Sequence, residues 1–150
     1  MTTTSGFSAT STTDEVLAGL DLTGRRFLVT GASGGLGLET SRALASKGAI
    51  VVMAARDQAK NETAAAGIRA VHPDAKLESL ILDLGSLTSV RAAAVEFMSR
   101  NVALNGLILN AGIMATPLGH TVDGFEQQFG VDHLGHFLLA RDLLPRLVES

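Results

Sequence analysis

The 150-residue sequence predicts an α/β fold in which helices flank a doubly wound parallel sheet. Three observations lead to this class. Apolar, β-branched segments without polar alternation recur along the chain, as strands buried on both faces of a sheet require. A stretch with helical periodicity follows each of them, and no internal repeat interrupts the alternation. Strands that alternate with helices pair in parallel through right-handed crossovers.

Residues 1–20 are predicted to form a flexible N-terminal extension, because Ser, Thr and Gly dominate their first half. Within this extension, Thr12 and Glu15 have capping-box spacing, so residues 14–20 are expected to form a short helix. The alternative is a tail that merely lies on the surface. The folded domain is then expected to occupy residues 21–150.

The first half of this domain predicts two strand–helix pairs. Residues 26–30 (RFLVT) form the first strand, and the helix after it ends at Gly48. Residues 50–55 (IVVMAA) form the second strand, and residues 57–71 form a helix that ends at the His72-Pro73 turn. The shared face of the first of these helices is predicted to consist of Leu36, Thr40, Ala43 and Leu44.

The second half repeats the pattern. Residues 77–84 (LESLILDL) form the third strand, and a helix follows from Ser86. Residues 106–112 (GLILNAG) form the fourth strand with its exit turn, and a long helix runs from about Gly124, with Pro145 as a candidate kink. The four strands are expected to be the first four of a Rossmann-type sheet, in the order 3-2-1-4. The amphipathic face of the helix after the third strand consists of Val90, Ala93, Ala94, Phe97 and Met98.

Composition and charge exclude several functional classes. The net charge is −3 and Lys and Arg are scattered singly, so no basic face for nucleic acid is expected. The absence of cysteine excludes disulfides, thiolate metal sites and a cysteine nucleophile. No stretch approaches the ~18 apolar residues of a transmembrane helix, and the first 24 residues resemble neither a secretory signal nor a transit peptide. These features predict a cytoplasmic protein.

The residues after the first strand predict a phosphate-binding turn. Gly31, Gly35 and Gly37 follow Thr30 in a T-G-x-x-x-G-x-G pattern. A diphosphate needs free backbone N–H groups at a helix N-terminus, and glycine permits positive φ and removes Cβ atoms from the path of the ligand. Because the turn lies between a buried strand and an amphipathic helix, we interpret it as a dinucleotide cradle rather than a simple bend. Ser33 is expected to cap the backbone or to contact phosphate.

The ends of the other strands carry further candidate contacts. Arg56 stands where an acid would bind the ribose 2′-hydroxyl of NAD, and a guanidinium fits a 2′-phosphate, which favours NADP. The alternatives are a helix cap or a solvated side chain, and the adjacent Asp57 leaves NAD possible. Asp83 and Leu84 are expected to bind adenine, with a capping or turn acid as the alternative. The segment 110–112 is expected to lie beside the cofactor ribose, and the alternative is an ordinary exit turn, which would have a similar sequence.

With these motifs, the chain resembles the short-chain dehydrogenase/reductase family, and within it the retinol-dehydrogenase-like and WW-domain-oxidoreductase-like branch. The resemblance covers residues 22–148 and rests on LVTGASGGLGLET, MAARD, LDLGSLTSV, LILNAGIM and DGFEQQFGVDHLGHFLLARDLLP, which occur in family order. It implies hydride transfer between NADP(H) and a small-molecule carbonyl or alcohol. It also implies that NADP(H), or alternatively NAD(H), binds at Gly31, Ser33, Gly35, Leu36, Arg56, Asp83, Leu84, Asn110, Ala111 and Gly112.

Two departures from the family bear on catalysis. Asp132 stands where the family usually carries an Asn that helps to hold a water in a proton relay, which makes Asp132 the candidate catalytic residue. An ionised carboxylate accepts hydrogen bonds but does not donate them. The family's catalytic Ser and Tyr-x-x-x-Lys lie C-terminal to the matched region, and this sequence has no Tyr. We therefore expect the cofactor-binding half of an oxidoreductase, inactive without its absent catalytic half. The alternative is a non-catalytic NADP(H)-binding or partner-docking module.

Two features of the C-terminal region have less specific interpretations. His133 and His136 are three residues apart, but no further ligand is evident, so no metal site is predicted and both are expected to pack or hydrogen-bond on the helix. The fourth strand is expected to have an exposed edge, which a homo-oligomer or a missing C-terminal half would cover. The C-terminal helix also has an apolar stripe, which is predicted to pack in the core or in a subunit interface. It consists of Phe125, Phe129, Phe137 and Leu144.

Overall fold

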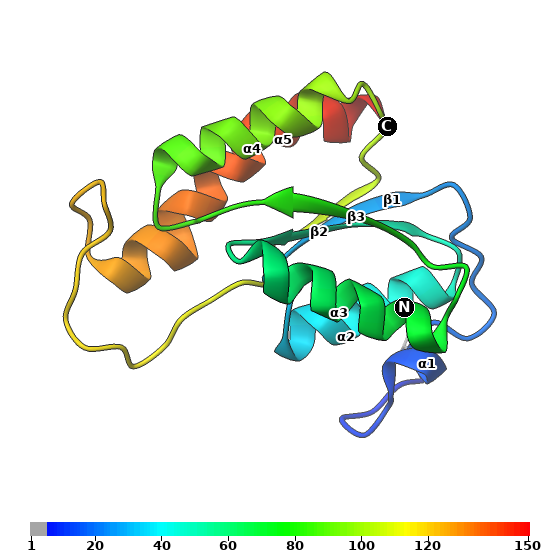
Figure 1. Cartoon of the computed structure of the whole chain (residues 1–150). Helices are drawn as coiled ribbons and strands as arrows, with labels where there is room; N and C mark the ends of the chain where they lie inside the picture. Colours follow the sequence, from blue (N-terminus) through cyan, green and yellow to red (C-terminus); the bar gives the residue numbers. More distant parts are fainter. Residues whose placement is uncertain (1–5) are drawn as a thin grey trace, which may run out of the picture.

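The computed structural model describes residues 6–150, and these contain a four-stranded parallel sheet between two layers of helices (Figure 1). The order across the sheet is β3-β2-β1-β4, and each of its three pairings is parallel. The predicted fold class and strand order are therefore confirmed. The strands are β1 (Arg26–Thr30), β2 (Ile50–Ala55), β3 (Lys76–Ile81) and β4 (Gly106–Ile108).

The helices lie on both faces of the sheet. Figure 1 shows α2 and α3 on one face and α4 and α5 on the other, as successive right-handed crossovers require. The short helix α1 packs against α2, and the π-helix η1 runs directly into α5. Their bounds are α1 (Thr13–Val16), α2 (Gly35–Ser46), α3 (Gln58–Val71), α4 (Leu87–Ser99), η1 (Phe129–Gly135) and α5 (His136–Glu149). None of the helices in residues 6–150 has both the length and the apolar character needed to cross a bilayer.

Successive strand residues point into the two helical layers, which explains why the strands show no polar alternation. Leu28 and Val52 pack with Phe97 in the core beneath α4 and α5. Val29 and Met53 belong to the second core, beneath α2 and α3. All five side chains are fully buried. The predicted apolar face of α4 is confirmed, since its first four members are buried and Met98 packs against them.

Side-chain caps determine where several helices begin. The Thr12 hydroxyl accepts from the Glu15 N–H, and the Glu15 carboxylate accepts from the Thr12 N–H, which confirms the predicted capping box. The helix it starts is shorter than expected, because α1 ends at Val16 and the chain then turns at Gly19 with a φ of 78°. The Ser86 hydroxyl caps α4 by accepting from the Ser89 N–H.

Two details differ from the sequence prediction. The third strand ends at Ile81 rather than Leu84, because the last bond from this segment to β2 is donated by the Leu82 N–H. The C-terminal helical run begins at Gln127 rather than near Gly124, because Gly124 lies in a turn and has a φ of 85°. The Glu126 carboxylate then accepts from the backbone N–H groups of Phe129 and Gln128, and these bonds lower the pKa of Glu126.

The predicted helix faces also need correction. In α2, Ala43 and Leu44 are buried as predicted, but Leu36 is 80% exposed and Thr40 is only half-buried. The buried face runs instead through Gly37, Ser41 and Ala45 beside them. The apolar stripe of the C-terminal helix is also outside the core, so the core interpretation is wrong and the interface interpretation stays a prediction. The exposed fractions lie between 40% and 62% for Phe125, Phe129, Phe137 and Leu144.

Candidate cofactor site

The carboxyl ends of the strands meet at one edge of the sheet and enclose a cavity of about 200 Å³. Segments that follow all four strands contribute to it, as the parallel topology requires. The predicted contacts that line it are Gly31, Ser33, Arg56, Asp83, Leu84, Ala111 and Gly112. The remaining predicted contacts, Gly35, Leu36, Gly37 and Asn110, lie outside the lining.

Two of the glycines allow three chain segments to approach closely. Gly31 has a φ of 67°, and a Cβ on it would lie 2.9 Å from the Ala111 Cα. A Cβ on Gly37 would lie 2.5 Å from the side-chain nitrogen Nδ2 of Asn110 and closer still to the Gly31 carbonyl oxygen. Gly37 and Asn110 therefore form the packed support behind the cavity, because they hold α2 and the turn after β4 against the glycine turn.

The N-terminus of α2 opens next to this support. Its N-cap, Gly34, has an extended backbone and contributes no side-chain hydrogen bond. Gly35 follows with a φ of 54°, and a Cβ on it would meet nothing within 4 Å. Leu36 is exposed in the same first turn. The N–H groups of this turn thus have no side-chain cap, which leaves them available for an anion.

Arg56 and Asp57 have different environments at the end of β2. The Asp57 carboxylate accepts from the Lys60 N–H at 3.0 Å and caps α3, so the helix-cap role belongs to Asp57. Arg56 is exposed, lines the cavity, and has no hydrogen bond or ion pair with any residue in 6–150. Its guanidinium is therefore free to bind a ligand anion or to remain solvated.

Asp83 and Leu84 follow β3 in a tight turn. One Asp83 carboxylate oxygen accepts from the Gly85 N–H at 2.9 Å, so the turn-acid interpretation describes part of its role. Helix capping belongs to Ser86 instead. Leu84 is buried against the core beneath α4 and α5, and its carbonyl lies so close to Gly135 that a Cβ there would collide with it.

Thr30, at the end of β1, is a site residue that the sequence reasoning missed. Its buried hydroxyl is 3.0 Å from the backbone nitrogens of both Asn110 and Ala111 and 2.9 Å from His136 Nε2. The prediction that His136 packs or hydrogen-bonds on the helix is confirmed by its Nδ1, 3.0 Å from the Asp132 carbonyl, and Thr30 on the sheet is a second partner. His133 points outward, and its ring stacks with those of Phe129 and Phe137.

Asp132, the candidate catalytic residue, is exposed and does not line the cavity. One of its carboxylate oxygens accepts from the Ile113 N–H at 2.9 Å, so the side chain fixes the segment that follows Gly112. Ile113, Gln127 and Val131 complete the wall of the cavity near it. The sequence gives no signal for these three, because Ile113 and Gln127 lie between β4 and η1 and Val131 lies within η1, away from the strand-end motifs.

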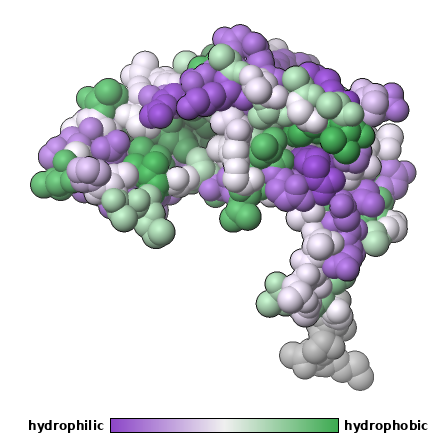
Figure 2. All heavy atoms as spheres, turned by 60° about the horizontal axis from the view of Figure 1, so that its bottom comes forward, coloured by the Kyte–Doolittle hydropathy of each residue, from purple (hydrophilic) through white to green (hydrophobic). Residues whose placement is uncertain are grey.

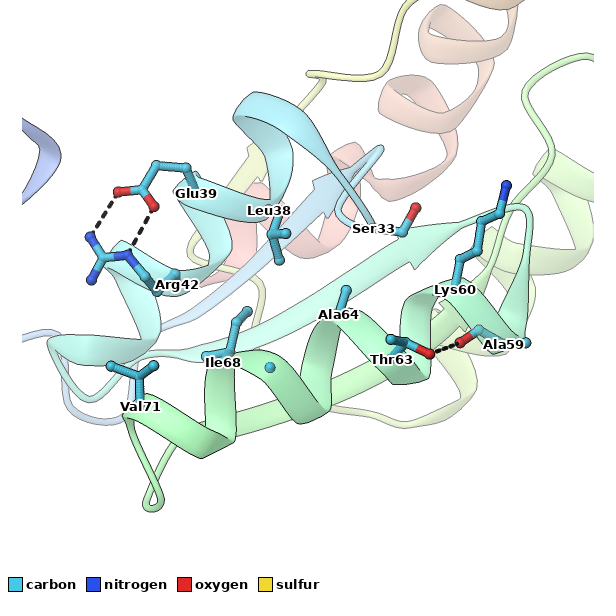
Figure 3. Close-up of a pocket in the computed structure, with 11 residues that line it drawn as sticks. Ser33, Leu38, Glu39, Arg42, Ala59, Lys60, Thr63, Ala64, Ile68 and Val71 are labelled. Atoms are coloured by element: carbon cyan, nitrogen blue, oxygen red, sulfur yellow. Dashed lines mark hydrogen bonds and ion pairs between the residues drawn. The ribbon is translucent and has the colours of Figure 1, made fainter.

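A larger groove of about 700 Å³ lies between α2 and α3 (Figure 3). Apolar side chains such as Leu38, Ala64 and Ile68 line its floor, and Ser33 lines both this groove and the smaller cavity. In the space-filling view, apolar surface gathers in the hollows of this side of the molecule, with hydrophilic atoms around them (Figure 2). The sequence patterns did not predict this groove, because each helix alone reads as an ordinary amphipathic helix.

Comparison with known proteins identifies the family. Residues 25–150 match the family model for short chain dehydrogenases. The chain is 50% identical over 124 residues to short-chain dehydrogenase/reductase prx1 of Penicillium roqueforti, covering 83% of this chain and 36% of that protein. It is 47% identical over 131 residues to retinol dehydrogenase 12 of Mus musculus, covering 87% of this chain and 42% of that protein.

A solved structure supports the same relationship. The RhlG/NADP active-site complex of Pseudomonas aeruginosa is similar to this chain with a TM-score of 0.73 and 30% identity, covering 87% of this chain and 50% of that one. The chain spans less than half the length of the two curated relatives. The family match extends over most of the chain and includes the glycine turn and all four strands. The chain therefore belongs to the short-chain dehydrogenase/reductase family, and its sequence is retinol-dehydrogenase-like.

Proposed function

We propose that residues 21–150 are the NADP(H)-binding part of an oxidoreductase that moves a hydride between the cofactor and a small-molecule carbonyl or alcohol. The observation that carries this proposal is the convergence of four strand-end segments on one cavity. Its wall includes the guanidinium of Arg56, which has no partner among residues 6–150. When bound, NADP(H) supplies or accepts the hydride. The residues present fit such a group, because the uncapped backbone N–H groups at the start of α2 and the Arg56 guanidinium in the cavity wall are both suited to phosphate.

Each part of the dinucleotide has a proposed set of partners. The glycine turn and the open N-terminus of α2 bind the diphosphate through backbone N–H groups, with the Ser33 hydroxyl beside them. Asp83 and Leu84 contact the adenine, the first through its second carboxylate oxygen. The proposed diphosphate and ribose contacts are Gly31, Ser33, Gly35, Leu36, Gly37, Asn110, Ala111 and Gly112.

We further propose that NADP(H) is preferred over NAD(H) and that Arg56 sets this preference. A guanidinium can donate two parallel hydrogen bonds to a phosphate, and these charge-assisted bonds are stronger than neutral ones. Lys60, on the first turn of α3, adds a second cation, which lies 4.0 Å from the Asp57 carboxylate. Because Asp57 already caps α3, it competes less for a ribose hydroxyl, and NAD(H) is the weaker ligand.

Replacing Arg56 tests this assignment. Arg56→Ala is expected to weaken NADPH binding by about 10- to 100-fold, since hydrogen bonds to charged groups contribute about 1.5–3 kcal/mol. NADH affinity should change by less than about twofold, because NADH has no 2′-phosphate. Isothermal titration calorimetry with both nucleotides measures the ratio directly. Arg91→Ala is the matched control, since Arg91 is exposed on α4, outside the cavity. An unchanged NADPH-to-NADH ratio would refute the role of Arg56.

Catalysis is proposed to need residues that this sequence does not supply. The sequence has no Tyr, the residue type that the family resemblance assigns to proton exchange, so the 150 residues alone are expected to bind cofactor without turnover. Asp132 is proposed to hold a relay water through its second carboxylate oxygen. The same absence of Tyr favours one alternative, a non-catalytic NADP(H)-binding module. Consumption of NADPH, followed by its absorbance with a carbonyl substrate, would distinguish an enzyme from such a module.

A further inference from the structure

The hydrogen bonds around Thr30 determine the proton positions on a buried histidine. A hydroxyl group has one proton and two lone pairs. The N–H groups of Asn110 and Ala111, each 3.0 Å from the Thr30 oxygen, take both lone pairs. The hydroxyl proton is then donated to His136 Nε2 at 2.9 Å, which is closer than the alternative acceptor, the Ile108 carbonyl at 3.5 Å. His136 Nε2 must therefore be unprotonated.

The other ring nitrogen is constrained by a separate contact. His136 Nδ1 lies 3.0 Å from the backbone carbonyl of Asp132, which can only accept. Nδ1 must therefore carry a proton, and the ring is the neutral Nδ1–H tautomer. The His136 backbone N–H donates to the His133 carbonyl, so it is the imidazole of His136 that bonds to the Asp132 carbonyl.

Asp132 connects this pair back to the sheet edge. Its carboxylate accepts from the Ile113 N–H at 2.9 Å, two residues beyond Ala111, so the bonds form a closed circuit. His136 is only 4% exposed and Thr30 is fully buried, so water cannot readily replace either partner. Removing Thr30 or His136 leaves a buried donor or acceptor without its partner.

We infer that His136, held as the Nδ1–H imidazole, is a positioning residue that fixes the segment 110–113 and Asp132 as one unit. The inference rests on the proposed function, because this segment contributes Ala111 and Gly112 to the proposed cofactor cavity. Sequence spacing could not reveal this link, since Thr30 and His136 are 106 residues apart in the chain.

The tautomer is tested on the wild-type chain without any cofactor. Long-range ¹H–¹⁵N NMR spectra of protein labelled with ¹⁵N-histidine distinguish a protonated from an unprotonated ring nitrogen. At neutral pH, His136 is expected to show a protonated Nδ1 and an unprotonated Nε2. A protonated Nε2, in either the other tautomer or the imidazolium, would overturn the inference. Because this measurement needs no nucleotide, its failure is distinct from the failure of the proposed function.

Variants then test the positioning role. His136→Leu is expected to accelerate amide hydrogen exchange at Ala111 and Ile113 by about tenfold and to weaken NADPH binding by about tenfold, the loss of one buried hydrogen bond. His136→Gln can still accept from the Thr30 hydroxyl, so it should preserve the slow exchange at Ala111. His133→Leu, three residues earlier with an outward ring, is the control and should change neither quantity.

A double-mutant cycle separates this role from general packing. Thr30→Val and His136→Leu together should cost less affinity than the sum of the single losses, because both remove the same bond. Additive losses, or unchanged exchange at Ala111 in His136→Leu, would refute the coupling. If the wild-type chain binds no NADPH while the exchange rates follow the expected pattern, the proposed function fails and the positioning of the segment stands.

Discussion

At the scale of single residues, Gly37 has tight surroundings near the proposed cofactor site. A Cβ on Gly37 would approach the side-chain nitrogen Nδ2 of Asn110 to 2.5 Å. This nitrogen is held in place because it donates to the Thr30 backbone carbonyl. Gly37→Ala must therefore displace both Asn110 and the glycine turn. We expect it to destabilise the fold by about 1–3 kcal/mol and to weaken NADPH binding. Urea unfolding followed by far-UV circular dichroism measures the first effect.

Gly67 provides a matched control of opposite sign. It lies within α3, and a Cβ on it would meet nothing within 4 Å. Gly67→Ala is expected to stabilise the fold by about 0.5–1 kcal/mol, because alanine has the higher helix propensity. If Gly37→Ala were as harmless as Gly67→Ala, the close approach of α2 to the turn after β4 would not matter for the fold.

The sequence predicts site residues well where local geometry demands a residue type. The glycine turn is recognisable because Gly31 must adopt a positive φ immediately after a buried strand. Thr30 and Ile113 escaped prediction for a different reason. Their contributions depend on partners at His136 and Asp132 that fold close to them from distant positions in the chain.

At the scale of elements, α1 is attached to the domain by a small polar cluster. The Arg42 guanidinium on α2 bonds to Asp14 of α1 at 2.9 Å and to Glu39 at 2.7 Å, and the Thr13 hydroxyl also donates to Glu39. The hydrogen bonds from Arg42 first, and then from Thr13, lower the pKa of Glu39 to about 2. Figure 3 shows this Glu39–Arg42 pair at one end of the groove between α2 and α3.

The lowered pKa predicts an acid-dependent contribution to stability. Because the pKa of Glu39 is about 2 when folded and 4.5 when unperturbed, its contribution is complete above pH 4.5 and is lost as the pH falls towards 2. Glu39→Gln should therefore be less stable than wild type at pH 7, with a difference that shrinks towards pH 2. The difference is small, since Glu39 is 44% exposed and solvent screens the pair.

Denaturant midpoints from pH 7 to pH 2.5 measure this difference. Glu62→Gln is the matched control, because the Glu62 carboxylate on α3 bonds to the neutral Gln58 amide. That variant should follow the acid dependence of the wild type. A Glu39→Gln difference that stays constant across this range would contradict the assigned role of the Arg42 cluster.

The elements themselves differ in how well the sequence predicts them. β1 and β2 have the bounds that the sequence predicts, because their central residues are apolar and are buried on both faces of the sheet. The start of the C-terminal helix and the π-helix η1 were not foreseen. A π-helix has no hydrophobic period of its own, and here its carbonyl at Asp132 is satisfied by the side chain of His136.

At the scale of the whole molecule, the strand order divides the proposed cofactor cavity between two parts of the chain. β1 pairs with β2 on one side and with β4 on the other. Arg26 at the start of β1 and Asn105 just before β4 share a hydrogen bond although they are 79 residues apart. The cavity segments that follow β1, β2 and β3 come from strands that are neighbours both in the sequence and in the sheet. Ala111 and Gly112 instead follow β4, which lies on the other side of β1.

This topology has a consequence for the kinetics of folding. Closing a long loop costs entropy before any contact rewards it, and β4 offers only a three-residue pairing in return. We therefore expect β4 to dock late, after β1, β2 and β3 have assembled. A ligand of the cavity then binds only beyond the folding barrier, so NADPH at 100 times its Kd should slow unfolding by about 100-fold and leave the refolding rate unchanged.

Stopped-flow circular dichroism measures both rates, and the absence of Trp and Tyr makes the backbone signal the natural probe. Faster refolding with NADPH would show instead that β4 is already in place at the barrier. On the late-docking order, a nascent chain acquires its nucleotide affinity only when residues near 110 have left the ribosome and turned back to β1. The bound nucleotide would then contact the segments on both sides of β1, and it would oppose the separation of β4 from β1 that opens the long loop between these strands.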